Sequence, residues 1–177
     1  MKTLLDQKQL AVAIQQMAQQ ISQRHPHLAN LIFVGIQRRG VILAQRLIHF
    51  YQQQNMLLPS LGTLDINLYR DDFSSLNKVP VVHATEISES IHNKGIILID
   101  EVLYTGRTIR AAMDALMDLG RPRFIELAVL VDRGGRELPI QANYVSLVHP
   151  IGADEEIQVR FQELDGEEGV RSVRRDP

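Results

Sequence analysis

The chain contains no cysteine among its 177 residues, so a disulfide framework and a thiolate metal site are both excluded. Long hydrophobic runs are missing as well, and no apolar stretch is long enough to span a bilayer. The apolar start of the chain is interrupted from Asp6 onward, too early for the core of a secretory signal. We therefore expect a cytoplasmic protein with no membrane partner.

An excess of charge of one sign is also lacking. The chain has 19 Lys and Arg against 21 Asp and Glu, a formal net charge of −2. This balance argues against strong, non-specific nucleic-acid binding by the whole surface, while a local basic face remains open. No Gly-Lys-Ser/Thr phosphate loop follows any expected strand, which disfavours a general nucleotide-binding ATPase.

One stretch concentrates the residues that carry chemistry. The apolar run Ile96–Ile99 predicts a buried parallel strand, and two carboxylates stand where we expect it to end. A turn follows, and a helix is expected from about Arg107. Ligands in open α/β sheets bind beyond the carboxyl ends of the strands. The candidate contacts are Asp100, Glu101, Val102, Leu103, Tyr104, Thr105, Gly106, Arg107 and Thr108.

The residue types in this stretch suit a sugar phosphate. Amides of a turn that opens a helix attract a phosphate, and Gly106 lets the backbone approach it closely. The carboxylates of Asp100 and Glu101 accept hydrogen bonds from vicinal hydroxyls, directly or through a hydrated Mg²⁺. The stretch therefore predicts a phosphate site beside a ribose site. The alternative is an ordinary strand, loop and helix with a solvated acidic pair.

A second polar loop, with Arg38, Arg39 and Gly40, follows the apolar run Leu31–Ile36. Two arginines can hold an anion with fork-like donors. A solvated arginine pair at a helix start is the alternative. Cations are disfavoured at a helix N-terminus, which favours a bound anion.

Hydrophobic periodicity predicts a single α/β domain with a mainly parallel sheet and helices on both faces. We place the domain at residues 1–164 and a charged, frayed tail at 165–177. The expected helices cover 6–24, 41–53 and about 107–119, and the expected strands 31–36, 61–69, 124–131, 144–148 and 157–164. A further hairpin strand is expected at 79–85.

The central stretch resembles the signature of the type I phosphoribosyltransferases, which bind 5-phosphoribosyl-1-pyrophosphate (PRPP). The likeness runs from Ile96 to Thr108 except at Glu101, where relatives usually carry Asp. It implies Mg²⁺ accompanying PRPP or pyrophosphate, with no metal site made of protein side chains alone. It also implies a flexible hood at about residues 70–95, although a surface hairpin without a catalytic part is the alternative.

The resemblance also implies roles for the two polar loops. The loop at Arg38 would hold pyrophosphate, often with a non-proline cis peptide bond there. Asp100 and Glu101 would fix the ribose, and residues 104–108 would bind the 5′-phosphate. We take Asp100, Glu101, Arg38 and Arg39 as the candidate catalytic residues.

Segments outside the signature narrow the resemblance to the branch that regulates pyrimidine operons by attenuation and also acts as a uracil phosphoribosyltransferase. These segments are 64–72 and 131–140. The branch implies uracil and PRPP as substrates, UMP as product and effector, a messenger RNA leader as a possible partner, and a homodimer or higher oligomer. The candidate substrate contacts added here are Arg70, Asp71, Asp72, Asp132 and Arg133. Arg133 can form the rim of the base pocket or serve as a structural anchor.

Several positions depart from the family pattern or bear on its function. Purine-specific relatives place a carboxylate where this chain has Tyr104, which favours a pyrimidine here. Glu101 is one methylene longer than Asp, and a displacement of about an ångström can cost roughly a hundredfold in rate. Two further departures weaken the expected RNA binding: Gln15, Gln16 and Gln19 replace basic or hydroxyl residues, and Gly135 replaces His. The competing hypothesis is a non-catalytic sensor of PRPP or UMP that acts on RNA or a protein.

Overall fold

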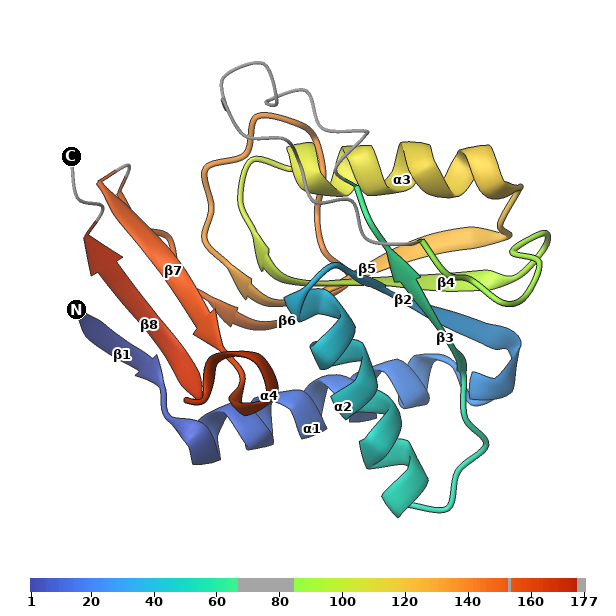
Figure 1. Ribbon diagram of the computed structural model, residues 1–177, viewed down its shortest axis with the longest axis horizontal. Coiled ribbons are helices and arrows are strands. Elements are labelled where there is room, and N and C mark those ends of the chain that lie inside the picture. Colours follow the sequence, from blue (N-terminus) through green and yellow to red (C-terminus); the bar gives the residue numbers. More distant parts are fainter. Residues whose placement is uncertain (67–84, 153, 175–177) are drawn as a thin grey trace.

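The computed structural model describes residues 1–66, 85–152 and 154–174. Its centre is a five-stranded sheet with the order β3-β2-β4-β5-β6, and each neighbouring pair is parallel (Figure 1). This confirms the expected α/β fold with a mainly parallel sheet. The strands are β2 (Leu31–Ile36), β3 (Ser60–Leu64), β4 (Gly95–Leu103), β5 (Phe124–Asp132) and β6 (Tyr144–Val148).

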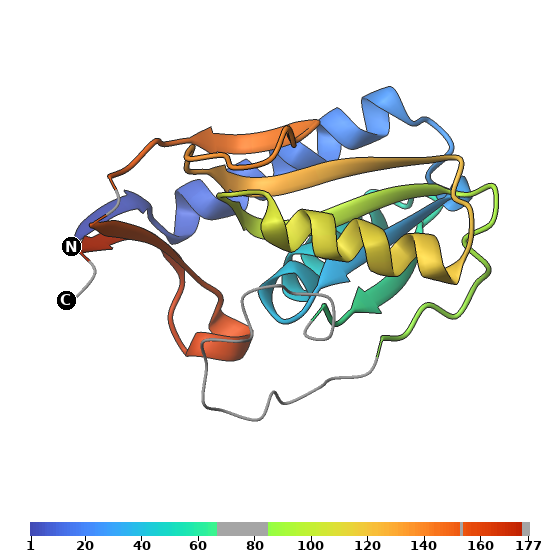
Figure 2. The same cartoon turned by 90° about the horizontal axis from the view of Figure 1, so that it is seen from above.

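Helices cover both faces of this sheet, as expected. α1 (Gln7–Arg24) and α2 (Arg39–Gln53) lie on one face, and α3 (Arg107–Leu119) lies on the other (Figures 1 and 2). In β4, Ile97 and Ile99 belong to the core under α1 and α2, whereas Ile96 and Leu98 belong to the core under α3. A strand buried on both faces needs such a continuous apolar run.

Local signals in the sequence explain where α1 begins and ends. Asp6 accepts a hydrogen bond from the Gln9 amide at 2.8 Å, and the Gln9 side chain accepts one from the Asp6 amide at 2.9 Å. This capping box satisfies two otherwise unpaired amides. The helix ends at Arg24, just before Pro26. A 3₁₀ turn, η1 (Leu28–Asn30), then leads into β2.

A second, antiparallel sheet is made of β1 (Lys2–Leu5), β8 (Gly169–Arg174) and β7 (Glu155–Arg160), with β8 in the middle. Figure 1 shows it beside the end of the central sheet where α2 and α3 begin. The expectation of a frayed tail is therefore wrong for residues 169–174, because β8 is hydrogen-bonded on both sides. The division of the chain at residue 164 stays a prediction.

Three other element boundaries differ from expectation. β7 ends at Arg160, and a short helix, α4 (Gln162–Asp165), occupies the rest of the segment expected to be a strand. β3 ends at Leu64 rather than at residue 69. β4 continues through the acidic pair instead of ending before it, because its pairing with β5 runs as far as Leu103.

Part of the predicted hood, residues 70–84, lies outside the described residues, and so does the hairpin strand expected at 79–85, apart from residue 85. Within the described part of the chain, no helix is long and apolar enough to cross a membrane.

Candidate active site

The acidic pair, Asp100 and Glu101, lies near the carboxyl end of β4. Successive side chains of a strand point to opposite faces of the sheet. Asp100 is 6% exposed, whereas Glu101 is only partly buried. The Asp100 Oδ1 atom accepts a hydrogen bond from the Glu101 amide at 2.9 Å. Glu101 lines a pocket together with Arg39 from the start of α2. The two carboxylates therefore lie on opposite faces of β4, and Glu101 is the one that lines this pocket.

The turn after β4 is held rigidly by the segment 137–140. The Thr105 carbonyl accepts hydrogen bonds from the amides of Glu137 and Leu138, at 2.9 and 3.2 Å. Gly106 caps α3 with φ +92°, a left-handed conformation that favours glycine. The Arg107 Nε atom lies 2.6 Å from Glu137 Oε2. This arrangement presents the first amides of α3 as an anion site.

Close glycine contacts bring the arginine loop directly over the end of β4. A Cβ atom on Gly40 would lie 2.4 Å from the Ile99 carbonyl oxygen, and one on Gly35 would lie 2.5 Å from Val41 Cα. Only glycine allows both approaches. The peptide bond between Gln37 and Arg38 is cis, as the family resemblance implies.

The space between this loop and β7 is a pocket of about 210 Å³. Its lining combines two arginines with two carboxylates. The lining residues are Arg39, Glu101, Glu156, Ile157, Gln158, Val159 and Arg160. Because β7 lines a pocket that also contains Glu101 and Arg39, the small sheet forms one wall of the candidate site.

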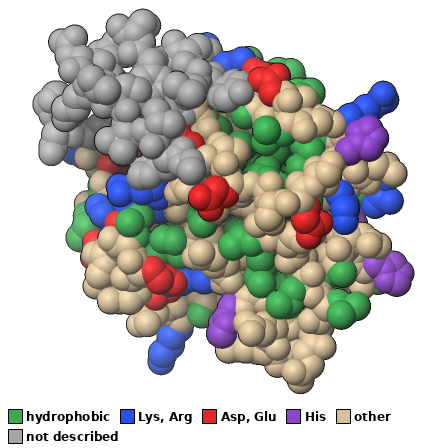
Figure 3. Space-filling model, turned by 45° about the vertical axis from the view of Figure 1, so that its right-hand side comes forward, with side chains coloured by type: hydrophobic (Ala, Val, Ile, Leu, Met, Phe, Trp, Pro, Cys, Tyr) green, Lys and Arg blue, Asp and Glu red, His purple; other side chains and the backbone are tan. Residues whose placement is uncertain are grey.

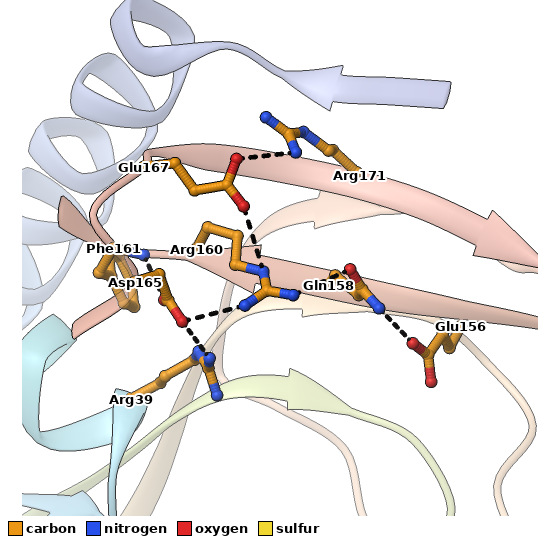
Figure 4. Close-up of polar contacts among 8 residues, drawn as sticks. All are labelled: Arg39, Glu156, Gln158, Arg160, Phe161, Asp165, Glu167 and Arg171. Carbon is orange, nitrogen blue, oxygen red and sulfur yellow. Dashed lines mark hydrogen bonds and ion pairs between the residues drawn. The ribbon is translucent and has the colours of Figure 1, made fainter. Parts of the chain in front are cut away.

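Arg39 is bound by a residue that sequence reasoning assigned to the tail. Its Nη2 atom lies 2.5 Å from Asp165 Oδ1, and the side chain of Asp165 is 5% exposed (Figure 4). Burial would raise the pKa of the Asp165 carboxyl. The hydrogen bond from the Phe161 amide and the contacts with Arg39 and Arg160 outweigh burial, and lower that pKa below its ordinary value.

On the other side of the site, Arg133 lies over the ring of Tyr104, with its Cζ atom 3.8 Å from the ring centroid. Arg133 is 5% exposed and donates to the carbonyl of Glu155 at 3.2 Å. Of the two roles left open for Arg133, these contacts support that of a structural anchor. A place at the rim of the base pocket stays a prediction.

Arg136 is a further organiser of this region that sequence reasoning missed. It donates to the carbonyls of Tyr104 and Ile140, at 2.7 and 2.9 Å, and forms an ion pair with Asp132. The sequence signal that could have indicated this ion pair is the spacing of four residues between Asp132 and Arg136. Through these contacts Arg136 holds the turn after β5 against the turn of residues 104–108.

The described candidate residues gather at one end of the central sheet. They are Arg38, Arg39, Gly40, Asp100, Glu101, Val102, Leu103, Tyr104, Thr105, Gly106, Arg107, Thr108, Asp132 and Arg133. Arg70, Asp71 and Asp72 lie outside the described residues. Besides Arg136, the sequence patterns did not indicate Arg160 and Asp165 as members of this region. Arg160 ends the weakly patterned strand β7, and Asp165 lies just after it.

The donor set fits a magnesium ion carried by a substrate. Among the described residues, no group of three or more His, Asp or Glu side chains could hold a metal by itself. Mg²⁺ is usually bound by one or two carboxylates together with substrate phosphates and waters. Asp100 and Glu101 supply such a pair of carboxylates at the carboxyl end of β4, and Glu101 lines the same pocket as Arg39.

The positions that bear on the expected RNA binding are exposed and uncharged. Gln15, Gln16 and Gln19 are all exposed on α1, and Gly135 is exposed after β5. On the face shown in Figure 3, the described basic and acidic side chains are interspersed.

Comparisons with known proteins agree with this geometry. Residues 1–165 match the phosphoribosyl transferase domain. The bifunctional protein PyrR of Pelotomaculum thermopropionicum is 49% identical over 94% of this chain and 92% of its own length. The PyrR protein of Bacillus cereus strain B4264 is 48% identical over 94% of both chains.

Solved structures support the fold alone, because their sequences are distant. A hypoxanthine-guanine phosphoribosyltransferase from Bacillus anthracis has a TM-score of 0.73 and 18% identity over 98% of both chains. A hypoxanthine phosphoribosyltransferase from Staphylococcus aureus has a TM-score of 0.74 and 22% identity over 98% of this chain and 91% of its own. The chain therefore belongs to the phosphoribosyltransferase family and, within it, to the group of the bifunctional PyrR proteins.

Proposed function

We propose that this protein is a cytoplasmic uracil phosphoribosyltransferase, which converts uracil and PRPP to UMP and pyrophosphate. The observation that carries this proposal is the convergence of three groups at one end of the sheet. The acidic pair of β4, the amides that open α3 and the arginine loop before α2 lie around the same strand ends. They match the ribose, 5′-phosphate and pyrophosphate of PRPP in chemistry and order.

In this reaction, N1 of uracil forms a bond to the anomeric carbon while the bond from that carbon to pyrophosphate breaks, and uracil loses its N1 proton. The transition state has oxocarbenium character, so orientation of the sugar and stabilisation of the leaving group matter most. Asp100 and Glu101 orient the ribose hydroxyls. Arg38 and Arg39 stabilise the negative charge of the departing pyrophosphate. A bound Mg²⁺ supplies further neutralisation of pyrophosphate charge.

Tyr104 supports a pyrimidine over a purine. Its ring is packed under the guanidinium of Arg133, at a position where purine-specific relatives carry a carboxylate. A phenol cannot serve as the carboxylate that handles a proton on the purine ring. The proposed base pocket therefore lacks the group that purine transfer needs at this position.

Calorimetry beside a turnover assay separates an enzyme from a non-catalytic sensor. We expect PRPP and UMP each to bind, and UMP to form from uracil and PRPP with Mg²⁺. Binding of both ligands without turnover would instead support a sensor that acts on RNA or a protein partner.

We also propose a second function, UMP-responsive binding to the leader RNA of pyrimidine genes, by a homodimer or higher oligomer. The similarity to proteins named bifunctional favours it. The exposed glutamines of α1 release no counterions on binding RNA. We therefore expect RNA binding to be weak or steeply lost as salt rises. Nanomolar, UMP-enhanced filter binding of the leader transcript at physiological salt would contradict this and make attenuation the primary role.

A further inference from the structure

The buried carboxylate of Asp165 accepts hydrogen bonds from three residues. Its Oδ1 atom lies 2.5 Å from Arg39 Nη2 and 3.2 Å from Arg160 Nη1, and its Oδ2 atom accepts the Phe161 amide at 2.9 Å (Figure 4). Arg39 belongs to the start of α2, whereas Arg160 ends β7. One carboxylate therefore fixes two guanidinium groups that come from distant parts of the sequence.

Both guanidinium groups line the pocket that also contains Glu101. The trio of Arg39, Arg160 and Asp165 carries one net positive charge, because a guanidinium stays charged at any physiological pH. Glu101 and Glu156 add two carboxylates to the lining of the same pocket. Among the described residues, the buried Nε atom of Arg39 has no hydrogen-bond partner. A buried donor without an acceptor costs free energy. Asp165 does not accept from this Nε atom, so the Arg39 guanidinium keeps one donor for another acceptor.

A second set of contacts holds Arg160 in place. Its Nη2 atom donates to Gln158 Oε1 at 3.3 Å, and its Nε atom lies 3.7 Å from Glu167 Oε1. Gln158 in turn donates to Glu156, which lines the same pocket (Figure 4). A long cationic side chain loses conformational entropy when it binds an anion, and prior fixation reduces that cost.

We propose that Asp165 is a positioning residue for pyrophosphate, and that Arg160 is an additional pyrophosphate contact beside Arg39. Asp165 holds the two guanidinium groups side by side at the carboxyl end of β4. This inference rests on the proposed function, because it assigns a residue to the pyrophosphate half of that site. It gives the small sheet a role in leaving-group recognition, since β7 supplies Arg160 and the chain just after it supplies Asp165.

The competing explanation is that the Arg39–Asp165 pair only fastens the small sheet to α2. The two explanations differ in which ligands respond to a substitution. UMP has no pyrophosphate, and its phosphate is expected at the turn of residues 104–108. A positioning role affects PRPP and pyrophosphate but spares UMP, whereas loss of a fastening contact lowers stability and affects all three ligands.

The test compares Asp165→Asn, which keeps the shape and removes the charge, with Asp165→Glu, which keeps the charge. Glu163→Gln is the matched control, because Glu163 also lies on α4 and pairs with an α2 arginine, Arg46, at 2.7 Å. Neither Glu163 nor Arg46 lines the Arg39–Glu101 pocket. Calorimetry measures the dissociation constants of UMP, PRPP and pyrophosphate, the last two with Mg²⁺, and thermal unfolding gives the Tm of each variant.

We expect Asp165→Asn to weaken PRPP and pyrophosphate binding by roughly five- to twentyfold, the scale of a lost charge-assisted hydrogen bond. UMP binding should change by less than about twofold. Asp165→Glu should restore part of the loss, and Glu163→Gln should leave all three constants unchanged. Arg160→Gln should weaken pyrophosphate binding without affecting UMP.

Unchanged pyrophosphate binding in Asp165→Asn, or an equal loss for pyrophosphate and UMP, would overturn the proposal. The binding readout does not depend on turnover. If the wild-type protein binds PRPP and pyrophosphate but forms no UMP, the proposed catalysis fails while the role of Asp165 is still decided. If the wild type binds neither, both proposals fail.

Discussion

The guanidinium of Arg133 lies over the ring of Tyr104, with 3.8 Å between its Cζ atom and the ring centroid. A cation over an aromatic face contributes about 0.5–2 kcal/mol, the larger value where the pair is desolvated. Arg133 is also tied to the small sheet through the Glu155 carbonyl. The contacts of Arg133 therefore connect Tyr104 to β7.

Gly135 lies against the ring of Tyr104. Its φ is +71°, and a Cβ atom there would lie 2.6 Å from Tyr104 Cε2. We predict that Gly135→Ala lowers the free energy of unfolding by about 1–3 kcal/mol, through left-handed strain and the clash with the ring. In a Tyr104→Ala background the same change should cost only the strain, about 1–2 kcal/mol. Equal costs in both backgrounds, measured by urea unfolding, would show that the ring does not constrain position 135.

Thr105 tests the phosphate turn. Thr105→Val keeps the shape and removes a hydroxyl donor, while the carbonyl that binds Glu137 and Leu138 is retained. PRPP and UMP should both bind at least severalfold more weakly, because each places its 5′-phosphate there, and a lost hydrogen bond to a charged group costs about 1.5–3 kcal/mol. Unchanged affinity for both ligands in calorimetry would refute this placement.

Glu101 tests the acidic pair. Glu101→Asp shortens the side chain by one methylene at the mouth of the pocket shared with Arg39. If the longer side chain displaces a ribose contact, the substitution should raise turnover, because misplacement of about an ångström can cost roughly a hundredfold in rate. Steady-state kcat decides the matter. A fall in kcat would show that Glu101 is already fitted to this pocket.

Glu126 provides a test of stability away from the site. It is 8% exposed, accepts from Tyr144 Oη at 2.6 Å, and lies 2.8 and 2.9 Å from His25 Nε2 and Arg24 Nη2. Burial would raise the pKa of its carboxyl, but these three partners lower it overall. The stabilisation is therefore present above the ordinary glutamate pKa of about 4.3, and is lost as pH falls through the lower value of the folded state.

Glu126→Gln should accordingly reduce the free energy of unfolding by about 1–3 kcal/mol at pH 7, and by less as the pH falls below about 4. Urea unfolding at several pH values measures the difference. Glu137→Gln is the control, since its partner Arg107 is half exposed and such pairs contribute about 0–1 kcal/mol. A Glu126→Gln effect that is independent of pH would contradict the ionic account.

The central sheet could be predicted because its strands are buried on both faces. The run Ile96–Ile99 and the strand Leu31–Ile36 are continuous apolar segments, which few other structures accommodate. The start of α1 was visible in Asp6 and the helical spacing that follows it. The two polar loops and the family resemblance also indicated candidate residues that the structure brings to one end of this sheet.

The small sheet could not be predicted in the same way. β8, residues Gly169–Arg174, is rich in charge, and its pairing with β1 joins the two ends of the chain. Such non-local pairing leaves no periodic signal in either segment. The contact between Asp165 and Arg39 was hidden for the same reason, since most of the chain separates the two residues.

The most direct test of the central claim is the initial rate of nucleotide formation from PRPP and Mg²⁺ with uracil, orotate, hypoxanthine or guanine, each in a separate reaction. The account predicts formation of UMP from uracil, with rates for the two purines and for orotate lower by at least about a hundredfold, the discrimination expected when needed polar partners are absent. Formation of IMP or GMP as fast as UMP, or no nucleotide from uracil by a protein that binds PRPP, would contradict it.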